Sequence, residues 1–147
     1  MSRPRGRTTA MLAVVAATIS LSACTEVEAP EKEHYSPATI APVEGEKDLV
    51  SVTLTKEGAF RIEIATGTVK LRRGRRSIPY ASLLYEKDGS AFVYTNPRGL
   101  TYIRAHVDVD RVAGDRVLLR EGPAAGTRVV TTGAQQVHGA ELEYGEY

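Results

Sequence analysis

Apolar and polar positions alternate along much of the second half of the chain. The segment YIRAHVDVDRV (residues 102–112) shows the pattern most clearly, because every second residue is apolar: Ile103, Ala105, Val107 and Val109. A period of two is typical of a strand with one buried face. Gly114 and Asp115 lie in a turn before the apolar run RVLLR, so the pattern predicts a β-hairpin over residues 101–120.

Similar patterns lie on both sides of this hairpin. YASLLYEKDGSAFVYTN (residues 80–96) predicts a second hairpin with Asp88 and Gly89 at its turn. Short strands are predicted in LVSVTLT, GTVKLRR and GTRVVTTG. TKEGAFRIEIA fits two structures, because its first residues suit the start of a short helix whereas FRIEI alternates like a strand. The pattern therefore predicts an all-β domain of about six to eight short antiparallel strands, barrel-like or a sandwich, which limits open sheet edges.

The chain begins with a different pattern. Three arginines precede the apolar run TTAMLAVVAATISLSA, which at about 16 residues is shorter than the roughly 20 that a membrane-spanning helix needs. Residues 1–23 are therefore predicted to be a secretory signal peptide. The end of this run resembles the lipobox of bacterial lipoproteins, with the residues Leu21, Ser22, Ala23 and Cys24.

The lipobox resemblance gives the only cysteine of the chain a role. It implies that Cys24 carries a diacylglyceryl group and becomes the first residue of the mature protein. Two acyl chains make membrane anchoring stable, so the expected location is the extracytoplasmic face of a cell membrane, with membrane lipid as a partner. The alternative is an ordinary signal peptide that leaves Cys24 as a free thiol.

Residues 24–48 separate the apolar start from the alternating part of the chain. The stretch after Cys24 contains seven acidic residues, two lysines and three prolines, without apolar periodicity. Such a composition cannot bury enough apolar surface to offset its ordering entropy. We therefore predict a disordered acidic tether over residues 24–48 and a β-rich domain over residues 49–147.

Composition and motifs exclude several classes of function. The net charge of +1 gives no overall basic field, so no nucleic-acid partner is predicted. A single cysteine cannot form an internal disulfide or a cysteine-based zinc site. The chain has no GxSxG elbow, no GxxxxGK phosphate loop and no GxGxxG motif. We therefore predict no catalytic residue, no cofactor and no enzymatic activity.

Two groups of residues remain as candidate sites. LRRGRR is a candidate patch for lipid phosphates or an acidic partner, because guanidinium groups bind phosphate in bidentate fashion; the alternative is a solvated hairpin tip. The patch consists of Arg72, Arg73, Arg75 and Arg76. The second group shares one strand face at metal-ligand spacing, but a solvated face paired with Arg104 is favoured over a metal site. This group consists of His106, Asp108 and Asp110.

The other polar and aromatic candidates are weaker. His34 and His138 are isolated in the sequence and are expected to be solvated. The chain has seven tyrosines and no tryptophan. Exposed tyrosine rings suit glycan or protein contacts, but rim positions on strands are the favoured interpretation.

A series of spaced motifs runs from Ile78 to Ala134. IPYASLL, DGSAFVY, VDV and GDRVLLREGPAAGTRVVTTG follow one another in this order. Residues 78–134 resemble the C-terminal, membrane-proximal part of periplasmic adaptor subunits, also called membrane fusion proteins, of RND-type efflux pumps. The resemblance implies a β-rich, non-enzymatic domain that docks on the extracytoplasmic part of a transporter. The stretch between Cys24 and Leu49 has no room for that family's helical hairpin or lipoyl domain, which implies a reduced accessory domain.

Two functional hypotheses follow. The first is a membrane-anchored, non-enzymatic lipoprotein that associates, like an adaptor, with an efflux or other envelope transporter. The alternative is a lipoprotein that binds a small ligand, a metal or a cell-wall glycan through His106, Asp108, Asp110 and the tyrosines.

Overall fold

The computed structural model describes residues 36–145, which belong to one compact unit, His34–Tyr147. The predicted signal peptide, the lipobox with Cys24, His34 and the first part of the predicted tether lie outside the described residues.

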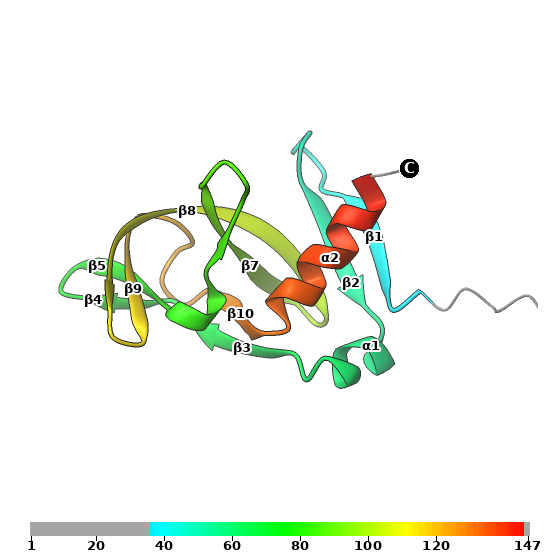
Figure 1. The fold of residues 1–147 in the computed structure, drawn as a ribbon, viewed down its shortest axis with the longest axis horizontal. Helices are drawn as coiled ribbons and strands as arrows, with labels where there is room; N and C mark the ends of the chain where they lie inside the picture. Colours follow the sequence, from blue (N-terminus) through cyan, green and yellow to red (C-terminus); the bar gives the residue numbers. More distant parts are fainter. Residues whose placement is uncertain (1–35, 146–147) are drawn as a thin grey trace, which may run out of the picture. The chain divides into compact units, whose positions relative to one another are not determined.

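Ten strands, two α-helices and one 3-10 turn make up the described part of the chain (Figure 1). The strands belong to one sheet, and the all-β fold class is confirmed. The elements in chain order are β1 (Ala38–Pro42), β2 (Val50–Leu54), α1 (Lys56–Arg61), β3 (Ala65–Thr68), β4 (Lys70–Arg72), β5 (Arg75–Pro79), the 3-10 turn η1 (Tyr80–Ser82), β6 (Leu84–Tyr85), β7 (Ala91–Arg98), β8 (Thr101–Ala113), β9 (Arg116–Glu121), β10 (Arg128–Thr132) and α2 (Ala134–Gly145).

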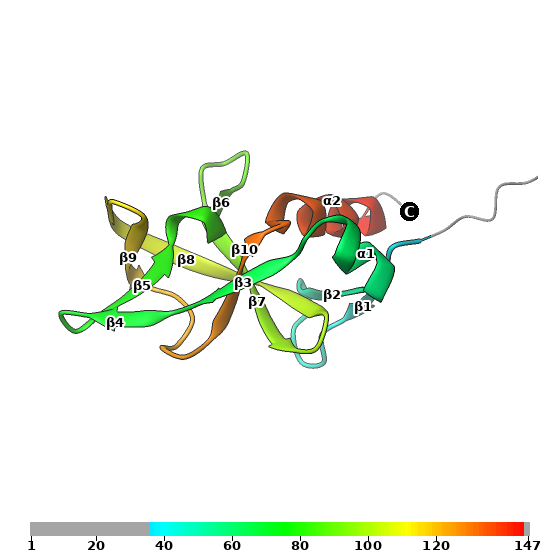
Figure 2. The same cartoon turned by 90° about the horizontal axis from the view of Figure 1, so that it is seen from below.

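The sheet curls into a barrel-like arrangement. Its strand order is β3-β10-β7-β8-β9-β5-β4, and β3 and β4 are separated only by Val69, so one stretch of chain lies at both ends of the order. Figure 2 shows this stretch running from α1 towards the β4–β5 hairpin. The side chains inside the curl form the first core, consisting of Val69, Ile78, Ala91, Val93, Val107, Val117, Leu119 and Val129.

Strand β8 belongs to both halves of the sheet. Its first part pairs with β7 and β2, and its last part pairs with β9. The register shifts at Asp108 and again between Val109 and Arg111, and such bulges bend a strand and increase its twist. The predicted alternation holds up to Val107, which is 1% exposed inside the curl. Both predicted hairpins, β8–β9 and β6–β7, are present.

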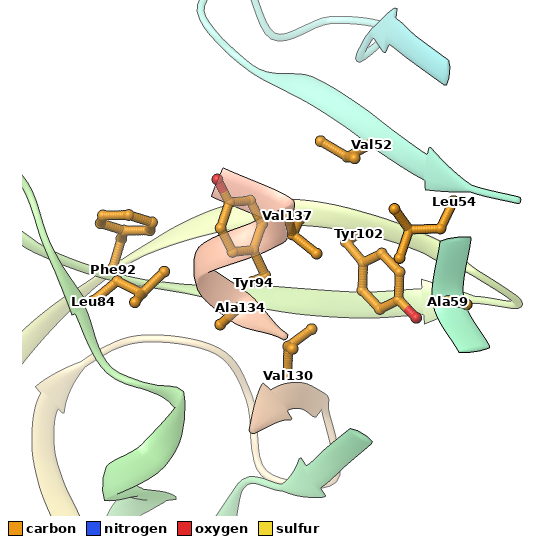
Figure 3. Close-up of a cluster of buried hydrophobic side chains, with 10 residues drawn as sticks. All are labelled: Val52, Leu54, Ala59, Leu84, Phe92, Tyr94, Tyr102, Val130, Ala134 and Val137. Atoms are coloured by element: carbon orange, nitrogen blue, oxygen red, sulfur yellow. The ribbon is translucent and has the colours of Figure 1, made fainter. Parts of the chain in front are cut away.

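A second core lies on the other face of β7 and β8. Helix α2 covers this face together with β1, β2 and α1, and Figure 3 shows the side chains between them. The largest fully buried members are Tyr94 and Tyr102. Consequently β7 is buried on both faces over Ala91–Tyr94. The sheet therefore has one core inside its curl and a second core on its outer face.

The structure differs from the predicted elements in three places. Residues 38–42, predicted to lie in the tether, form β1, because Ala38 and Ile40 pack against the second core and the strand pairs with β2. The ambiguous segment after Thr55 is a short helix, α1. Helix α2 was not predicted. With β1, with the strand break at Val69 and with β5, which no predicted strand covers, the described part has ten strands rather than six to eight.

Two contacts fix the start and the position of helix α1. The hydroxyl of Thr55 accepts a hydrogen bond from the Gly58 amide at 2.9 Å, which is the N-cap arrangement. Gly58 lies so close to the chain before β1 that a Cβ on it would lie 2.7 Å from the carbonyl oxygen of Pro37. The helix therefore docks on the start of the domain, where a side chain at residue 58 would not fit.

Candidate functional site

The arginines of the predicted patch lie on and around the β4–β5 hairpin. Arg72 ends β4, Arg73 and Gly74 form the turn, and Arg75 begins β5. Arg72 lies opposite Arg75 in the ladder, whereas Arg76 lies opposite Leu71. Because successive residues of a strand point to opposite faces, Arg76 faces away from Arg72 and Arg75. The structure therefore divides the predicted patch between two faces.

The face with Arg72 and Arg75 forms one wall of a shallow cavity with a volume of about 610 Å³. Arg111 and Arg116, from β8 and β9, join it. Sequence reasoning missed both residues, since they are about 40 positions from the LRRGRR motif; the pairing of β5 with β9 and of β9 with β8 brings them together. We call this cavity the arginine depression; it is lined by Arg72, Arg73, Arg75, Arg111, Ala113, Arg116 and Leu118.

Arg116 is the buried member of the depression. Its side chain donates from Nε to the Ser77 hydroxyl at 2.9 Å and from Nη2 to the Ser77 carbonyl at 2.5 Å, with a longer contact of 3.4 Å to the Thr68 carbonyl. The residue is 9% exposed. Burial lowers the pKa of Arg116, and the positive charge of Arg72 lowers it further, while Asp115 opposes both.

In the candidate metal site, an arginine pairs with the two aspartates. Arg120 donates to both carboxylate oxygens of Asp108 at 2.9 Å and lies 3.5 Å from Asp110. This hydrogen bonding lowers the pKa of the Asp108 carboxyl. Within residues 36–145, no group of three or more His, Cys, Asp or Glu side chains is placed to hold a metal ion. The expected pairing of this face with Arg104 is wrong, because Arg104 lies in the layer under α2.

A polar cluster joins α2 to the sheet. Arg104 of β8 forms ion pairs with Glu86 and, at 3.1 Å, with Glu141 of α2. The hydroxyl of Tyr94 donates to Glu141 and lies 3.2 Å from Nδ1 of His138. The ring of His138 also packs against that of Phe92, with centroids 5.2 Å apart and planes tilted by 57°, so the expectation that His138 is solvated is wrong.

Burial and charge hold the Tyr94 hydroxyl of the cluster in its protonated form. Burial and the neighbouring Glu141 carboxylate raise the pKa of Tyr94 strongly, so its hydroxyl stays protonated and donates. The guanidinium of Arg104 lies 4.5 Å from the centre of the Phe92 ring, which adds a cation–π contact. These contacts stabilise the position of α2 on the sheet.

His138 makes this attachment sensitive to pH. Burial lowers its pKa, Arg104 lowers it further, and Glu141 opposes them. Unfolded His138, with a pKa of about 6.5, takes up a proton at a higher pH than the folded form. The contribution of this residue is therefore complete above about pH 6.5 and is lost as the pH falls below that value.

We expect the melting temperature of the wild-type protein to fall between pH 7.5 and pH 5.5, and the fall to be smaller in His138→Gln. Asp88 and Asp108 do not contribute in this window, since their pKa values lie below the ordinary 3.8. Thermal unfolding followed by circular dichroism at each pH measures the effect. An identical fall in both proteins would contradict it.

Two exposed tyrosines flank a further cavity. Tyr80 is 52% exposed and Tyr85 is 58% exposed, in contrast to the buried Tyr94 and Tyr102. Both line a cavity of about 410 Å³ between η1, β6 and the start of α2, which we call the tyrosine groove. Tyrosine is enriched in the core of protein interfaces, because its ring is apolar and its hydroxyl can form hydrogen bonds.

No helix in the described part of the chain is long and apolar enough to cross a membrane. No protein-family model, curated protein or solved structure matches this chain.

Proposed function

We propose that the chain is a non-enzymatic lipoprotein, anchored through Cys24 on the extracytoplasmic face of a membrane, whose β-domain associates with an efflux transporter or another envelope protein. The observation that carries the association is the tyrosine groove, where two half-exposed aromatic side chains flank one cavity. Apart from Gln135 and Gln136, its lining residues fall within residues 78–134, the part of the sequence that resembles membrane-proximal adaptor domains.

The anchor and the domain are close along the chain. Cys24 and Ala38, the first residue of β1, are 14 positions apart (38 − 24). A fully extended link of that length spans at most about 50 Å. A lipid at Cys24 would therefore keep the domain within the reach of the extracytoplasmic parts of a membrane protein.

The anchoring half of the proposal is tested by Cys24→Ala. We expect the wild-type protein to sediment with membranes and its mature N-terminal peptide to show a mass increase from lipid. Cys24→Ala should lose the lipid and move to the soluble fraction. An unmodified thiol in the mature wild-type protein, or an unchanged membrane fraction for the variant, would contradict the proposal.

The association half is tested by photocrosslinking in membranes. A photoreactive amino acid placed at Tyr85 is expected to capture an envelope protein, whereas the same probe at Glu57 on α1, also exposed, serves as the matched control. Capture from position 85 alone supports the groove as the contact surface. Recovery of the uncrosslinked chain alone from both positions would contradict partner binding.

A further inference from the structure

Five guanidinium groups face one another across the arginine depression. They come from parts of the chain that are far apart in sequence: the β4–β5 hairpin, β8 and β9. Among the described residues, the only ion pair made by one of the five is that of Arg75 with Asp110 at 3.6 Å. Asp110 is also shared with Arg120. The positive charge of the depression is therefore largely uncompensated by carboxylates of the described chain.

Arg116 is oriented as an anion ligand. Its Nε and Nη2 groups are held by Ser77 and Thr68, which fixes the plane of the guanidinium. Arginine has five N–H donors, and the two on Nη1 make no hydrogen bond to the described protein. No buried side-chain nitrogen or oxygen of the described residues lacks a partner, so Nη1 keeps some exposure to solvent, and Arg116 lines the depression. The oriented donors thus point to a ligand that arrives from solvent.

The crowding of like charges has an energetic consequence. Burial and, after it, the positive charge of Arg72 disfavour the charged form of Arg116 and lower its pKa, yet arginine remains protonated in proteins. An anion bound between the guanidinium groups would remove this repulsion and gain charge-assisted hydrogen bonds. A bound anion is therefore electrostatically favourable in the depression.

Phosphate matches this arrangement better than carboxylate does. A phosphate group presents three or four oxygens in a tetrahedral arrangement and can accept from several guanidinium groups at once, in bidentate pairs. A cavity of about 610 Å³ holds a phosphate together with a substituent. Neighbouring apolar contact comes only from Ala113 and Leu118 among the lining residues, which leaves recognition to charge and hydrogen bonding.

We propose that the arginine depression is a binding site for phosphate groups, with the buried Arg116 as its fixed ligand and Arg72, Arg73, Arg75 and Arg111 around it. The phosphate belongs either to the headgroup of an anionic lipid or to a soluble phosphate compound; both present the same chemistry. The site lies on strands other than those of the tyrosine groove and does not require the lipid at Cys24, so its failure would leave the proposed association untouched.

The test uses variants that keep the fold. Arg73 and Arg111 are exposed, and their side chains make no hydrogen bond or ion pair with the described protein, so the double variant Arg73→Gln/Arg111→Gln should fold. The matched control is Arg98→Gln/Arg128→Gln, which removes the same charge from two exposed arginines outside the depression. Arg116→Lys adds a second test, because it keeps the charge but loses the planar fork.

Two arms distinguish the sources of phosphate. Each full-length protein, with Cys24→Ala to remove the anchor, is titrated with inorganic phosphate by calorimetry and with vesicles of phosphatidylglycerol or phosphatidylcholine by sedimentation. We expect the depression variant to bind at least about tenfold more weakly than the control in at least one arm, with Arg116→Lys also weakened. Such a loss with phosphatidylglycerol vesicles alone supports a lipid headgroup, and a loss with inorganic phosphate alone supports a soluble compound. Binding in neither arm, or equal weakening in the control variant, would overturn the proposal.

Discussion

Tyr94→Ala is expected to lower the free energy of unfolding by about 3–5 kcal/mol, the range for removing a large aromatic side chain from a core. Tyr94 is 0% exposed and sits in the centre of the second core (Figure 3). Its ring packs edge-on against Phe92, with centroids 5.7 Å apart and planes at 85°. The variant loses this packing and the hydroxyl contacts to α2, so both layers of the domain are weakened. Denaturant unfolding followed by circular dichroism measures the change.

Two further variants separate packing from hydrogen bonding. Tyr94→Phe keeps the ring and removes the hydroxyl that contacts Glu141 and His138, so a loss of about 1–2 kcal/mol is expected. Tyr85→Ala removes an equally large side chain from a position that is 58% exposed, and should change the stability by less than about 0.5 kcal/mol. A loss for Tyr94→Ala no larger than that of Tyr85→Ala would contradict the second core.

Arg104→Met is expected to cost about 3 kcal/mol. Methionine replaces most of the aliphatic volume, but the variant leaves Glu86 and Glu141 without their cation. The side chain of Glu141 is only 11% exposed, and a carboxylate buried without its partner is costly. Because the side chain of Arg104 is itself 23% exposed, we take the lower end of the range for broken buried pairs. Urea unfolding at pH 7 measures the loss.

The matched test combines Arg104→Met with Glu141→Gln. Glutamine removes the stranded charge and can still accept from the Tyr94 hydroxyl. The double variant should therefore be less destabilised than the sum of the two single variants, by about 0.5–3 kcal/mol. Strict additivity of the two losses would show that Arg104 and Glu141 do not interact in the folded protein.

Strand periodicity predicted the curled part of the sheet well. The alternation of Ile103 to Val109 and the turn at Gly114 specify the β8–β9 hairpin through local pattern alone. The second core was hidden, because it uses the polar-looking face of the same strand, where Arg104 lies beside the buried Tyr102. Strand β7 shows no simple period of two, because it is buried on both faces over Ala91–Tyr94.

The terminal elements depend on long-range contacts. Residues 38–42 read as part of an acidic, proline-containing stretch, and β1 forms there because it pairs with β2 and packs Ile40 under the second core. Over residues 134–143 of helix α2, the buried side chains are those of Ala134 and Val137, and Gly139 lies in the middle of the helix, so its sequence lacks a clear apolar stripe. Contacts with the sheet, rather than local propensity, stabilise it.

In the candidate site, too, the sequence predicts what lies close along the chain and not what long-range strand pairing brings together. The LRRGRR motif revealed three lining arginines by proximity in sequence, and Arg76 belonged to the other strand face. Arg111 and Arg116 read as ordinary charged strand positions, and only the strand order places them beside the hairpin. Nothing in the sequence distinguishes His138 from a surface histidine; its contact with Phe92 follows from the packing of α2 on the sheet.

The thirteen-residue strand β8 has a consequence for cooperativity. Val107 on one face of this strand belongs to the first core, and Tyr102 on the other face belongs to the second core. Neither core can open around this strand without disturbing the other, so partial unfolding of one half is suppressed. The slowest amide hydrogen exchange of the domain should therefore occur at the centre of β8 and report the global transition.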